Sequence, residues 1–421
     1  MKIVFLLHNA YAIGGTVRTT LNLAAALAGR HDVEIVSMSR HRRHPRFDVD
    51  PRIALVPLVD TRDGSADLDR PEYARPATDF PAEDRRHRQY SRLTDLRARD
   101  YLARCDADVV IGTRPGINVY VSRFAPRRAL RVGQEHLSHD AHGKRLRAVL
   151  ARHYRGLDAV VTVTAADAEV YRTRMTLPGV RVVPVPNIVP EAGVAPSDGR
   201  STVIAAAGRL VPGKRFDLLL EAFSAVAAKV PDWELRIYGG GAEKEHLQSL
   251  ADGLGLAGRA RLMGPVTPIE AEFAKASLVV SASDAESFGM TLAEAMRCGV
   301  PVISTDCPLG PAEIVTDGVD GRLVPVGDAR ALADAMLDLV GDGTRRRAMG
   351  QAALESAHRF DAAGIVARYE LLFAELRATR HRRAWSRERD RAVNWARRQL
   401  RSLRRRLPGR PHRDLLHPQG G

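Results

Sequence analysis

The residues with the clearest potential for chemistry are two glutamates, Glu286 and Glu294, in the segment 284–304. A short, apolar, β-branched run precedes the pair and another follows it, which predicts a buried parallel strand on either side. Residues from Gly289 onward keep helical spacing, so Glu286 is expected in the loop before a helix and Glu294 inside that helix. Because a carboxylate accepts hydrogen bonds, the pair is suited to holding hydroxyl groups.

The start of this predicted helix adds an anion site. The backbone N–H groups of Gly289, Met290 and Thr291 fall in its first turn, where they lack partners inside the helix. The helix dipole favours negative charge at the same end, and phosphate is the usual anion. Glu294 shares a helix face with Met290 and Thr291 by the spacing of three and four residues. Carboxylates beside a phosphate site indicate a sugar nucleotide as the ligand.

Two cations earlier in the chain, Arg209 and Lys214, could supply matching positive charge. Arg209 leaves a predicted buried strand, and Lys214 stands where the next helix begins, with Gly208 and Gly213 beside them. Both side chains can therefore converge on a diphosphate above a helix start. A loop arginine in an arginine-rich chain is ordinarily a solvated charge, but the position directly after a strand favours the functional interpretation.

Together these segments resemble retaining glycosyltransferases of family 4, which have the two-domain GT-B fold. The Ser-Phe-Gly between Glu286 and Glu294 is part of the match, and the similarity covers roughly residues 182–326. The other matching segments are the turn Gly208–Phe223, the glycine loop Tyr238–Gly241, the junction Pro186–Asn187 and the N-terminal pair Gly14 and Gly15.

The resemblance implies roles for the matching residues. Glu294 would bind the ribose hydroxyls and Glu286 the hydroxyls of the donor sugar. Arg209 and Lys214 would stabilise the leaving phosphate of a nucleotide diphosphate sugar. Further donor contacts are implied for Gly14, Gly15, Gly239, Phe288, Gly289 and Met290.

One histidine and several acidic pairs complete the candidate residues. His136 follows a predicted strand and, by resemblance, matches the family histidine that contacts the donor sugar near the reacting carbon. A lone histidine is more often structural, and His139 with Asp140 would permit a metal site, although no further ligands stand at a recognisable spacing. Three Asp-x-Asp pairs lie in a predicted insertion or before a strand, namely Asp48 with Asp50, Asp67 with Asp69, and Asp106 with Asp108. We predict metal-independent chemistry without a cofactor.

Alternating strands and helices predict an α/β protein with two Rossmann-like, doubly wound parallel-sheet domains that face each other across a cleft. The expected acceptor domain spans residues 1–188, with an insertion at about 40–90, and the donor domain spans 189–360. A closing helix at 361–376 and a basic tail at 377–421 follow. Thr16 or its neighbour is expected to cap the first helix. The segment 61–86 resembles a surface insertion or a disordered loop.

Composition narrows the class of protein. The chain has 421 residues, 45% hydrophobic content and three cysteines without metal-ligand spacing, which indicates a multi-domain protein of a reducing compartment. No segment approaches the roughly 20 apolar residues of a membrane span. The first apolar run is too short for a signal peptide, so we expect a cytoplasmic location. This expectation includes a peripheral position on the inner face of the membrane.

The basic tail holds most of the net charge of +14. From Arg377 onward there are fifteen arginines and three acidic residues, a balance of +12. Apolar residues recur there at helical spacing, namely Ala392, Trp395 or Ala396, Leu400, Leu403 and Leu407. A basic helix on an anionic membrane, through about 377–413, is the preferred interpretation. Solvated disorder and RNA binding stay open as alternatives, although the near-neutral body makes nucleic acid a poor partner.

The acceptor is less defined than the donor. Many family members carry a glycine pair where this chain has Gly310-Pro-Ala-Glu313, a form that resembles relatives acting on polyol-phosphate polymers. A glycan, lipid-linked or polyol-phosphate acceptor is therefore expected. Two rivals remain: a sugar-nucleotide 2-epimerase with the same fold, and a non-catalytic tethering protein that acts through its tail. The Gly14–Gly15 loop lacks G-x-G-x-x-G spacing, which lowers the case for an NAD enzyme.

Overall fold

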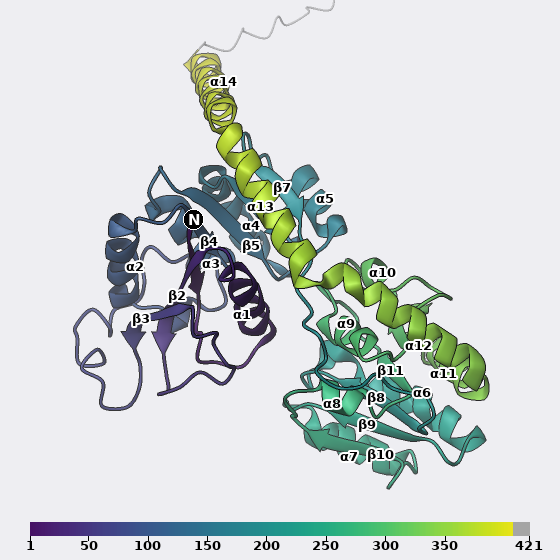
Figure 1. Ribbon diagram of the computed structural model, residues 1–421. Coiled ribbons are helices and arrows are strands. Elements are labelled where there is room, and N and C mark those ends of the chain that lie inside the picture. The colour runs from purple at the N-terminus through teal and green to yellow at the C-terminus, as the bar shows by residue number, and fades with distance from the viewer. Residues whose placement is uncertain (407–421) are drawn as a thin grey trace, which may run out of the picture.

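The computed structural model describes residues 1–406, and they form two lobes, each built on a parallel sheet (Figure 1). The first sheet has seven strands in the order β3-β2-β1-β4-β5-β6-β7. Its strands are β1 (Lys2–Leu7), β2 (Asp32–Arg40), β3 (Ala54–Asp60), β4 (Val109–Gly112), β5 (Leu130–Glu135), β6 (Ala159–Thr162) and β7 (Arg181–Pro184).

The second sheet has six strands in the order β10-β9-β8-β11-β12-β13. Its strands are β8 (Val203–Ala207), β9 (Glu234–Tyr238), β10 (Ala260–Gly264), β11 (Leu278–Ser281), β12 (Val302–Thr305) and β13 (Gly321–Val324). All the strand pairs in both sheets are parallel. In each sheet the strand order reverses beside the first strand, which confirms the predicted pair of doubly wound α/β units.

Helices connect successive strands. In the first lobe they are α1 (Gly15–Leu27), η1 (His87–Gln89), α2 (Arg92–Arg104), α3 (Pro115–Phe124), η2 (His139–Ala141), α4 (Lys144–His153), η3 (Tyr154–Gly156) and α5 (Ala165–Arg174). In the second they are η4 (Pro212–Lys214), α6 (Phe216–Lys229), α7 (Lys244–Gly253), α8 (Glu270–Phe273), α9 (Met290–Arg297), α10 (Pro311–Ile314), α11 (Ala329–Gly341), α12 (Gly343–Ala357) and η5 (His358–Phe360).

The C-terminal helices return to the first lobe. Helix α13 (Ala362–Ala378) buries Ile365, Tyr369 and Phe373 in the core beside β1 and α1. The Tyr369 hydroxyl and the Gln134 amide of β5 are hydrogen-bonded at 2.6 Å. The predicted closing helix is thus two residues longer at its C-terminal end, and it packs on the first sheet although the chain enters it from the second lobe (Figure 1).

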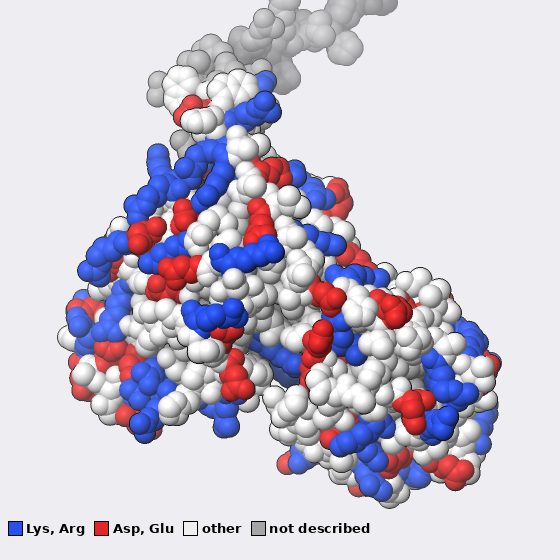
Figure 2. All heavy atoms as spheres, in the orientation of Figure 1, with Lys and Arg blue, Asp and Glu red and all other residues white. Residues whose placement is uncertain are grey.

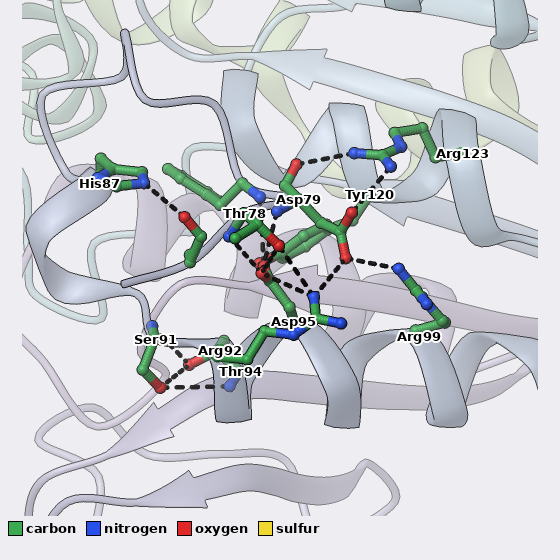
Figure 3. A network of polar contacts seen from close by, with 12 residues as sticks. Thr78, Asp79, His87, Ser91, Arg92, Thr94, Asp95, Arg99, Tyr120 and Arg123 are labelled. Carbon is green, nitrogen blue, oxygen red and sulfur yellow. Dashed lines mark hydrogen bonds and ion pairs between the residues drawn. The ribbon is translucent and has the colours of Figure 1, made fainter. Parts of the chain in front are cut away.

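The segment 61–90 has little regular structure, but it is packed and not disordered. The side chains of Phe80 and Tyr90 are 1% and 3% exposed, and their rings stack with centroids 3.6 Å apart. The Asp95 carboxylate, buried on α2, accepts backbone N–H groups of Thr78 at 2.6 Å and Asp79 at 2.9 Å (Figure 3). The alternative of a disordered loop is therefore wrong. The sequence of the segment does not reveal this order, because Asp95, which holds the segment in place, lies on a helix outside it.

Arginines from two helices complete this anchor. The Asp79 carboxylate pairs with Arg92 at 3.2 Å and Arg99 at 2.7 Å from α2, and with Arg123 at 2.8 Å from α3 (Figure 3). The Asp79 side chain is 8% exposed, so its charge is held by three cations in place of water. The segment is fixed to the same two helices that flank β4.

The basic tail continues as helix α14 (Arg380–Arg406), which extends away from the body (Figure 1). Its first turns are anchored because the guanidinium of buried Arg383 bonds the Asp158 carboxylate at 2.5 Å, and that of Arg387 bonds it at 3.1 Å. The backbone is helical through residue 406. Leu407 and the later residues of the predicted membrane-binding segment lie outside the described chain. In residues 1–406 we find no helix with the length and apolarity that crossing a bilayer requires.

Candidate functional site

Lys214 and Glu286 meet at the carboxyl edge of the second sheet. The ammonium of Lys214, from η4, forms an ion pair with the Glu286 carboxylate in the loop after β11. The Ser283 hydroxyl donates a hydrogen bond of 2.8 Å to the same Glu286 oxygen, and the Asp284 N–H bonds the Gly213 carbonyl at 3.1 Å. Two residues singled out in separate segments are therefore neighbours, and the loops that carry them are tied together.

The helix after Glu286 begins as predicted, with Gly289 as N-cap and Met290 as its first residue. Gly289 has φ 104°, a left-handed conformation that an L side chain rarely adopts. The Phe288 side chain is 5% exposed and packs edge-on against Phe360, with ring centroids 5.5 Å apart. Phe288 thus anchors the loop in the core, and only its backbone remains for a ligand at the helix start.

A second loop braces the Glu286 segment from behind. Glu286 and Leu309 form an isolated parallel β-bridge, and Leu309 has φ 83°. A Cβ on the next residue, Gly310, would lie 2.4 Å from the Phe288 carbonyl oxygen, so a side chain is excluded there. The segment that departs from the family pattern therefore shapes the backbone around Glu286.

The glycine loop packs against the turn that carries Arg209. A Cβ on Gly239 would lie 1.8 Å from the Gly208 carbonyl oxygen, which makes glycine obligatory at this position. The Leu210 N–H also bonds the Gly240 carbonyl at 3.0 Å. Gly239 thus holds the position of the Gly208–Lys214 turn, while the Arg209 side chain itself is exposed.

Glu294 has a partner that the sequence did not indicate. The Arg18 guanidinium, from α1 of the first lobe, reaches across and lies 3.0 Å from the Glu294 carboxylate. The same guanidinium forms an ion pair with Glu270 of α8. The three side chains are 25%, 8% and 7% exposed, so a cation of one domain is held between two largely buried acids of the other.

Burial controls the ionisation of this triad. Burial raises the pKa of Glu294 to about 7, the charge of Arg18 opposes that rise, and the charge of Glu270 adds to it. The second carboxylate oxygen of Glu270 is buried and has no hydrogen-bond partner in the structure. Glu294 is therefore a proton-sensitive group near neutral pH, and any ligand that it binds through its carboxylate must compete with Arg18.

His136 lies directly after β5, as expected, at the carboxyl edge of the first sheet. Its Nε2 atom is buried without a hydrogen-bond partner. Burial lowers the pKa of His136 to about 4, and the positive charge of Arg114 lowers it further. The imidazole is thus neutral at physiological pH and suited to hydrogen bonding, not to acting as a cation.

The N-terminal glycines take part in the helix start. Helix α1 begins at Gly15 with Gly14 as N-cap, and no side chain caps it. The predicted cap at Thr16 is wrong, because the helix begins one residue earlier and the Thr16 carbonyl accepts hydrogen bonds from Thr19 and Thr20. A Cβ at Gly14 or Gly15 would meet no atom within 4 Å, so protein packing does not require glycine there.

The structure adds His8, Arg86 and Arg114 of the first lobe as functional candidates that sequence reasoning missed. His8, Arg114 and His136 follow β1, β4 and β5, which are adjacent strands. Arg86, from the packed insertion, is close enough to Arg114 and to Arg209 that their charges lower its pKa beyond the effect of burial. His8 and Arg114 could have been found from the sequence because each stands just after a predicted strand. The sequence around Arg86 contains no comparable pattern. Figure 2 shows Lys and Arg atoms in the recess between the lobes.

Glu313 makes a second contact between the domains. Its carboxylate accepts the N–H groups of Ala165 at 2.8 Å and Ala166 at 2.7 Å, at the first turn of α5 in the first lobe. A carboxylate at a helix start is favoured by hydrogen bonding and by the helix dipole. The Gly-Pro-Ala-Glu segment therefore joins the domains as well as bracing the Glu286 loop.

The acidic candidates for a metal site have other partners. Within residues 1–406 no group of three or more His, Cys, Asp or Glu side chains gathers in a geometry that could hold a metal ion. In the three Asp-x-Asp pairs, Asp50 bonds Arg52, Asp67 bonds Arg97 and Asp106 bonds Lys2. His139 bonds its neighbour Asp140 at 3.0 Å. Metal-independent chemistry stays a prediction.

Comparison with known families agrees with this geometry. A family model described as "Glycosyl transferases group 1" matches residues 192–356, and one described as "Glycosyltransferase Family 4" matches residues 13–192. The second lobe thus carries a group 1 glycosyltransferase domain, and the first lobe a family 4 glycosyltransferase domain. The two matches divide between the two lobes, so each domain of this glycosyltransferase has its own family counterpart.

Solved structures identify the fold of this glycosyltransferase as GT-B. A mutant of S. aureus TarM, in complex with Fondaparinux, alpha-GlcNAc-glycerol and UDP, superimposes with a TM-score of 0.72 over 88% of this chain and 99% of TarM. The sequences are 17% identical. At that identity the likeness establishes the fold, which confirms the predicted two-domain architecture.

Two curated relatives illustrate the range of the family. An exopolysaccharide phosphotransferase of Streptomyces coelicolor is 35% identical over 391 residues, which are 89% of this chain but 41% of that protein. A poly(glycerol-phosphate) alpha-glucosyltransferase of Bacillus subtilis is 29% identical over 165 residues, which are 39% of this chain and 24% of that protein. The chain thus spans less than half the length of either relative.

Proposed function

We propose that this protein transfers a hexose from a nucleotide diphosphate sugar to a glycan, lipid-linked or polyol-phosphate acceptor, with retention at the anomeric carbon and without a metal ion. The observation that carries the proposal is the meeting of Lys214 with Glu286 beside the start of α9. A cation, a hydroxyl-binding carboxylate and a helix N-terminus at one point match a sugar diphosphate.

Charge stabilisation is the main catalytic effect in this scheme. As the bond to the sugar breaks, negative charge grows on the leaving diphosphate. Lys214, Arg209 and the N–H groups at the start of α9 lie on the donor side and offset that charge. Glu286 accepts hydrogen bonds from the donor sugar, while neutral His136 can contact a hydroxyl near the reacting carbon. The acceptor attacks the face that the leaving group departs from, and the leaving phosphate takes the acceptor proton.

The nucleoside end requires a change of partners. Glu294 can accept two ribose hydroxyls only as a carboxylate that has released at least part of its contact with Arg18. Donor binding is therefore coupled to the arrangement of the two domains, because Arg18 and Glu294 belong to different ones. Closing of the domains would then exclude water from the reacting sugar.

The first experiment is a thermal-shift panel of UDP-, GDP- and ADP-sugars with the full-length protein. A true donor stabilises the folded state, and the melting temperature should rise with its concentration. The same donor is then tested with Lys214→Gln, which should lose the stabilisation, and with Lys229→Gln, an exposed lysine at the far end of α6 that should retain it. Absence of any shift with all donors in the wild type would contradict the proposal.

The products separate this reaction from its rivals. Glycosyl transfer releases a nucleoside diphosphate only when acceptor is present, and NMR of the product should show the anomeric configuration of the donor. A 2-epimerase would act on the donor without acceptor. Transfer of a sugar phosphate, suggested by the name of the Streptomyces coelicolor relative, would release a nucleoside monophosphate. Unchanged turnover in excess EDTA is expected for metal-independent chemistry.

We further propose that α14 binds an anionic membrane surface. Trp385 and Trp395 are 63% and 65% exposed, and Trp385 lies two helical turns before exposed Ala392 on the same face. Arg383 fixes the base of α14 to the first lobe, so docking would bring the acceptor domain to the membrane. Flotation with phosphatidylglycerol vesicles should decrease on truncation after Thr379, and equal flotation would contradict docking. A non-catalytic tether predicts instead that Lys214→Gln leaves cellular glycans unchanged.

A further inference from the structure

The first lobe presents positive charge that the donor site does not explain. Beyond the effect of burial, the positive charge of Arg114 lowers the pKa of Arg86, and that of Arg209 in the second lobe adds a smaller effect in the same direction. In the described part of the chain, Arg86 and Arg209 have no carboxylate partner, and Arg114 has one at 3.9 Å. Arg86 and Arg114 therefore lie on either side of one carboxylate, Asp84, and this excess of positive charge is costly unless an anion offsets it.

The position of Arg114 follows from the sheet. The register pairs Leu6 with Gly112 and Gly112 with Gly133. Residues two or three positions further along therefore emerge together at the edge of the sheet, and these are His8, Arg114 and His136. Arg114 is the N-cap residue of α3, and its side chain is 18% exposed. Its Nε atom is buried and has no hydrogen-bond partner.

Arg86 is held in place by the insertion. The network around Asp79 and Asp95 fixes the segment just before it (Figure 3). The Arg86 N–H bonds an Asp84 oxygen at 2.9 Å, and its guanidinium bonds Gln89 at 2.9 Å. An exposed arginine on a packed segment is pre-oriented, so it loses little conformational freedom when it binds an anion.

Asp84 lies beside this cluster, and both of its carboxylate oxygens are already engaged. One of its oxygens accepts the Arg86 N–H, and the other accepts the Gly116 N–H at 3.3 Å. The two histidines add no compensating charge. Burial lowers the pKa of His8 to about 3, so both imidazoles are neutral and can hydrogen-bond hydroxyl groups. The cluster thus combines two guanidinium groups, one bonded to Gln89 and one 3.9 Å from Asp84, with two neutral polar rings.

We propose that Arg86 and Arg114 form a phosphate subsite for the acceptor, beside the donor diphosphate held by Arg209 and Lys214. The inference rests on the proposed glycosyl transfer and narrows its acceptor to a molecule with a phosphate near the attacking hydroxyl. A polyol phosphate and a phospholipid headgroup share that chemistry. Guanidinium groups bind phosphate through paired hydrogen bonds, and His8 and His136 would contact the hydroxyls that flank it.

The test measures phosphate binding apart from donor binding. Full-length protein is titrated calorimetrically with glycerol 1-phosphate and with glycerol, first alone and then with saturating UDP. We expect binding of glycerol 1-phosphate and none of glycerol in both conditions. The double variant Arg86→Gln, Arg114→Gln should weaken it by about tenfold or more, the scale of losing charge-assisted hydrogen bonds. UDP affinity should stay within about twofold of the wild type.

Arg85 and Arg88 supply a matched control. They are exposed arginines of the same segment, so Arg85→Gln, Arg88→Gln removes equal charge from the rim and should leave glycerol 1-phosphate binding intact. Equal loss in both double variants would mean unspecific attraction and would overturn the subsite. A loss of UDP affinity on replacing Arg86 and Arg114 would assign them to the donor, with the same consequence.

Two further measurements identify the source of the phosphate and distinguish failure of the subsite from failure of the proposed glycosyl transfer. Competition by phosphatidylglycerol but not phosphatidylcholine vesicles would indicate a lipid headgroup, and absence of competition would indicate a polyol phosphate. No binding of UDP, GDP or ADP, with glycerol 1-phosphate binding preserved, would contradict the nucleotide-sugar donor and leave the subsite standing. UDP binding without glycerol 1-phosphate binding would overturn the subsite alone.

Discussion

The two halves of the cleft are built in different ways. The second domain contributes Arg209 and Lys214 from one turn, and Glu286 and Glu294 from one loop and helix. The first domain contributes His8, Arg18, Arg86, Arg114 and His136, each from a different segment. The donor half is compact along the chain, whereas the other half is assembled from the edge of a sheet, one helix and an insertion.

Under the proposed function, the difference reflects what each half would bind. A nucleotide diphosphate sugar presents the same diphosphate and ribose whatever the sugar, and a fixed turn and helix start suffice for it. An acceptor varies, and side chains on separate loops can vary independently while the sheet that carries them is kept. We therefore expect replacements in the donor half to reduce chemistry, and replacements in the first domain to change affinity, specificity or domain coupling.

Lys214→Gln should have the largest effect. Loss of one cation that offsets charge on the leaving diphosphate is expected to reduce kcat by about 10²–10³-fold. The assay is release of nucleoside diphosphate at saturating donor and acceptor, with Lys229→Gln as control. If kcat is retained and only the donor KM rises, Lys214 binds the ground state and transition state equally, and the contrast between the halves is weakened.

The Glu294 carboxyl should make donor binding depend on pH. Its pKa of about 7 means that the ribose-binding carboxylate forms as pH rises through 7. The donor KM should thus fall about tenfold between pH 6 and pH 8. Glu294→Gln should raise the KM and remove this dependence. A dependence that survives in the variant would assign the titration to another group.

The same pKa has an opposite consequence for folding. Because it is raised above the usual 4.5, the folded state binds the proton more tightly than the unfolded state. The contribution to the free energy of unfolding is present below about 4.5 and is lost as pH rises to about 7. The melting temperature of Glu294→Gln, relative to that of the wild type, should therefore be higher at pH 8 than at pH 5.

Arg18→Gln probes the contact that joins the halves. It leaves Glu270 and Glu294 close together without their cation, and protonation of Glu294 limits the cost to about 1–2 kcal/mol of unfolding free energy. The donor KM should shift its pH dependence upward, since the pKa of Glu294 rises without Arg18. Arg18→Lys should restore the pH profile in part. An unchanged profile in Arg18→Gln would reduce Arg18 to a structural contact.

Glu313→Gln should have the smallest effect. The amide still accepts one hydrogen bond from the first turn of α5 but loses the charge that the helix dipole favours, for about 1 kcal/mol or less. Chemical denaturation measures the change, with exposed Glu355→Gln on α12 as control. A loss of kcat comparable to that of Lys214→Gln would show that this interdomain contact controls catalysis as well.

Much of the architecture could be predicted from sequence because local patterns set it. The two doubly wound sheets were expected, and the closing helix expected at 361–376 is found at Ala362–Ala378. The segment 61–90 could not be placed, since its order depends on Asp95 and on arginines of α2 and α3. The first-helix cap was also misplaced, because Gly14 needs no side chain to begin a helix.

What the sequence determined by itself is the donor half, where glycines, a strand end and a helix start stand within a few residues and fix one another through the local backbone. The tertiary structure decided which residues face that half. Arg18 reached Glu294, Glu313 reached α5, and Arg86 and Arg114 came together. Those contacts depend on sheet register and on the meeting of two domains, and both are set by packing between segments far apart in the chain.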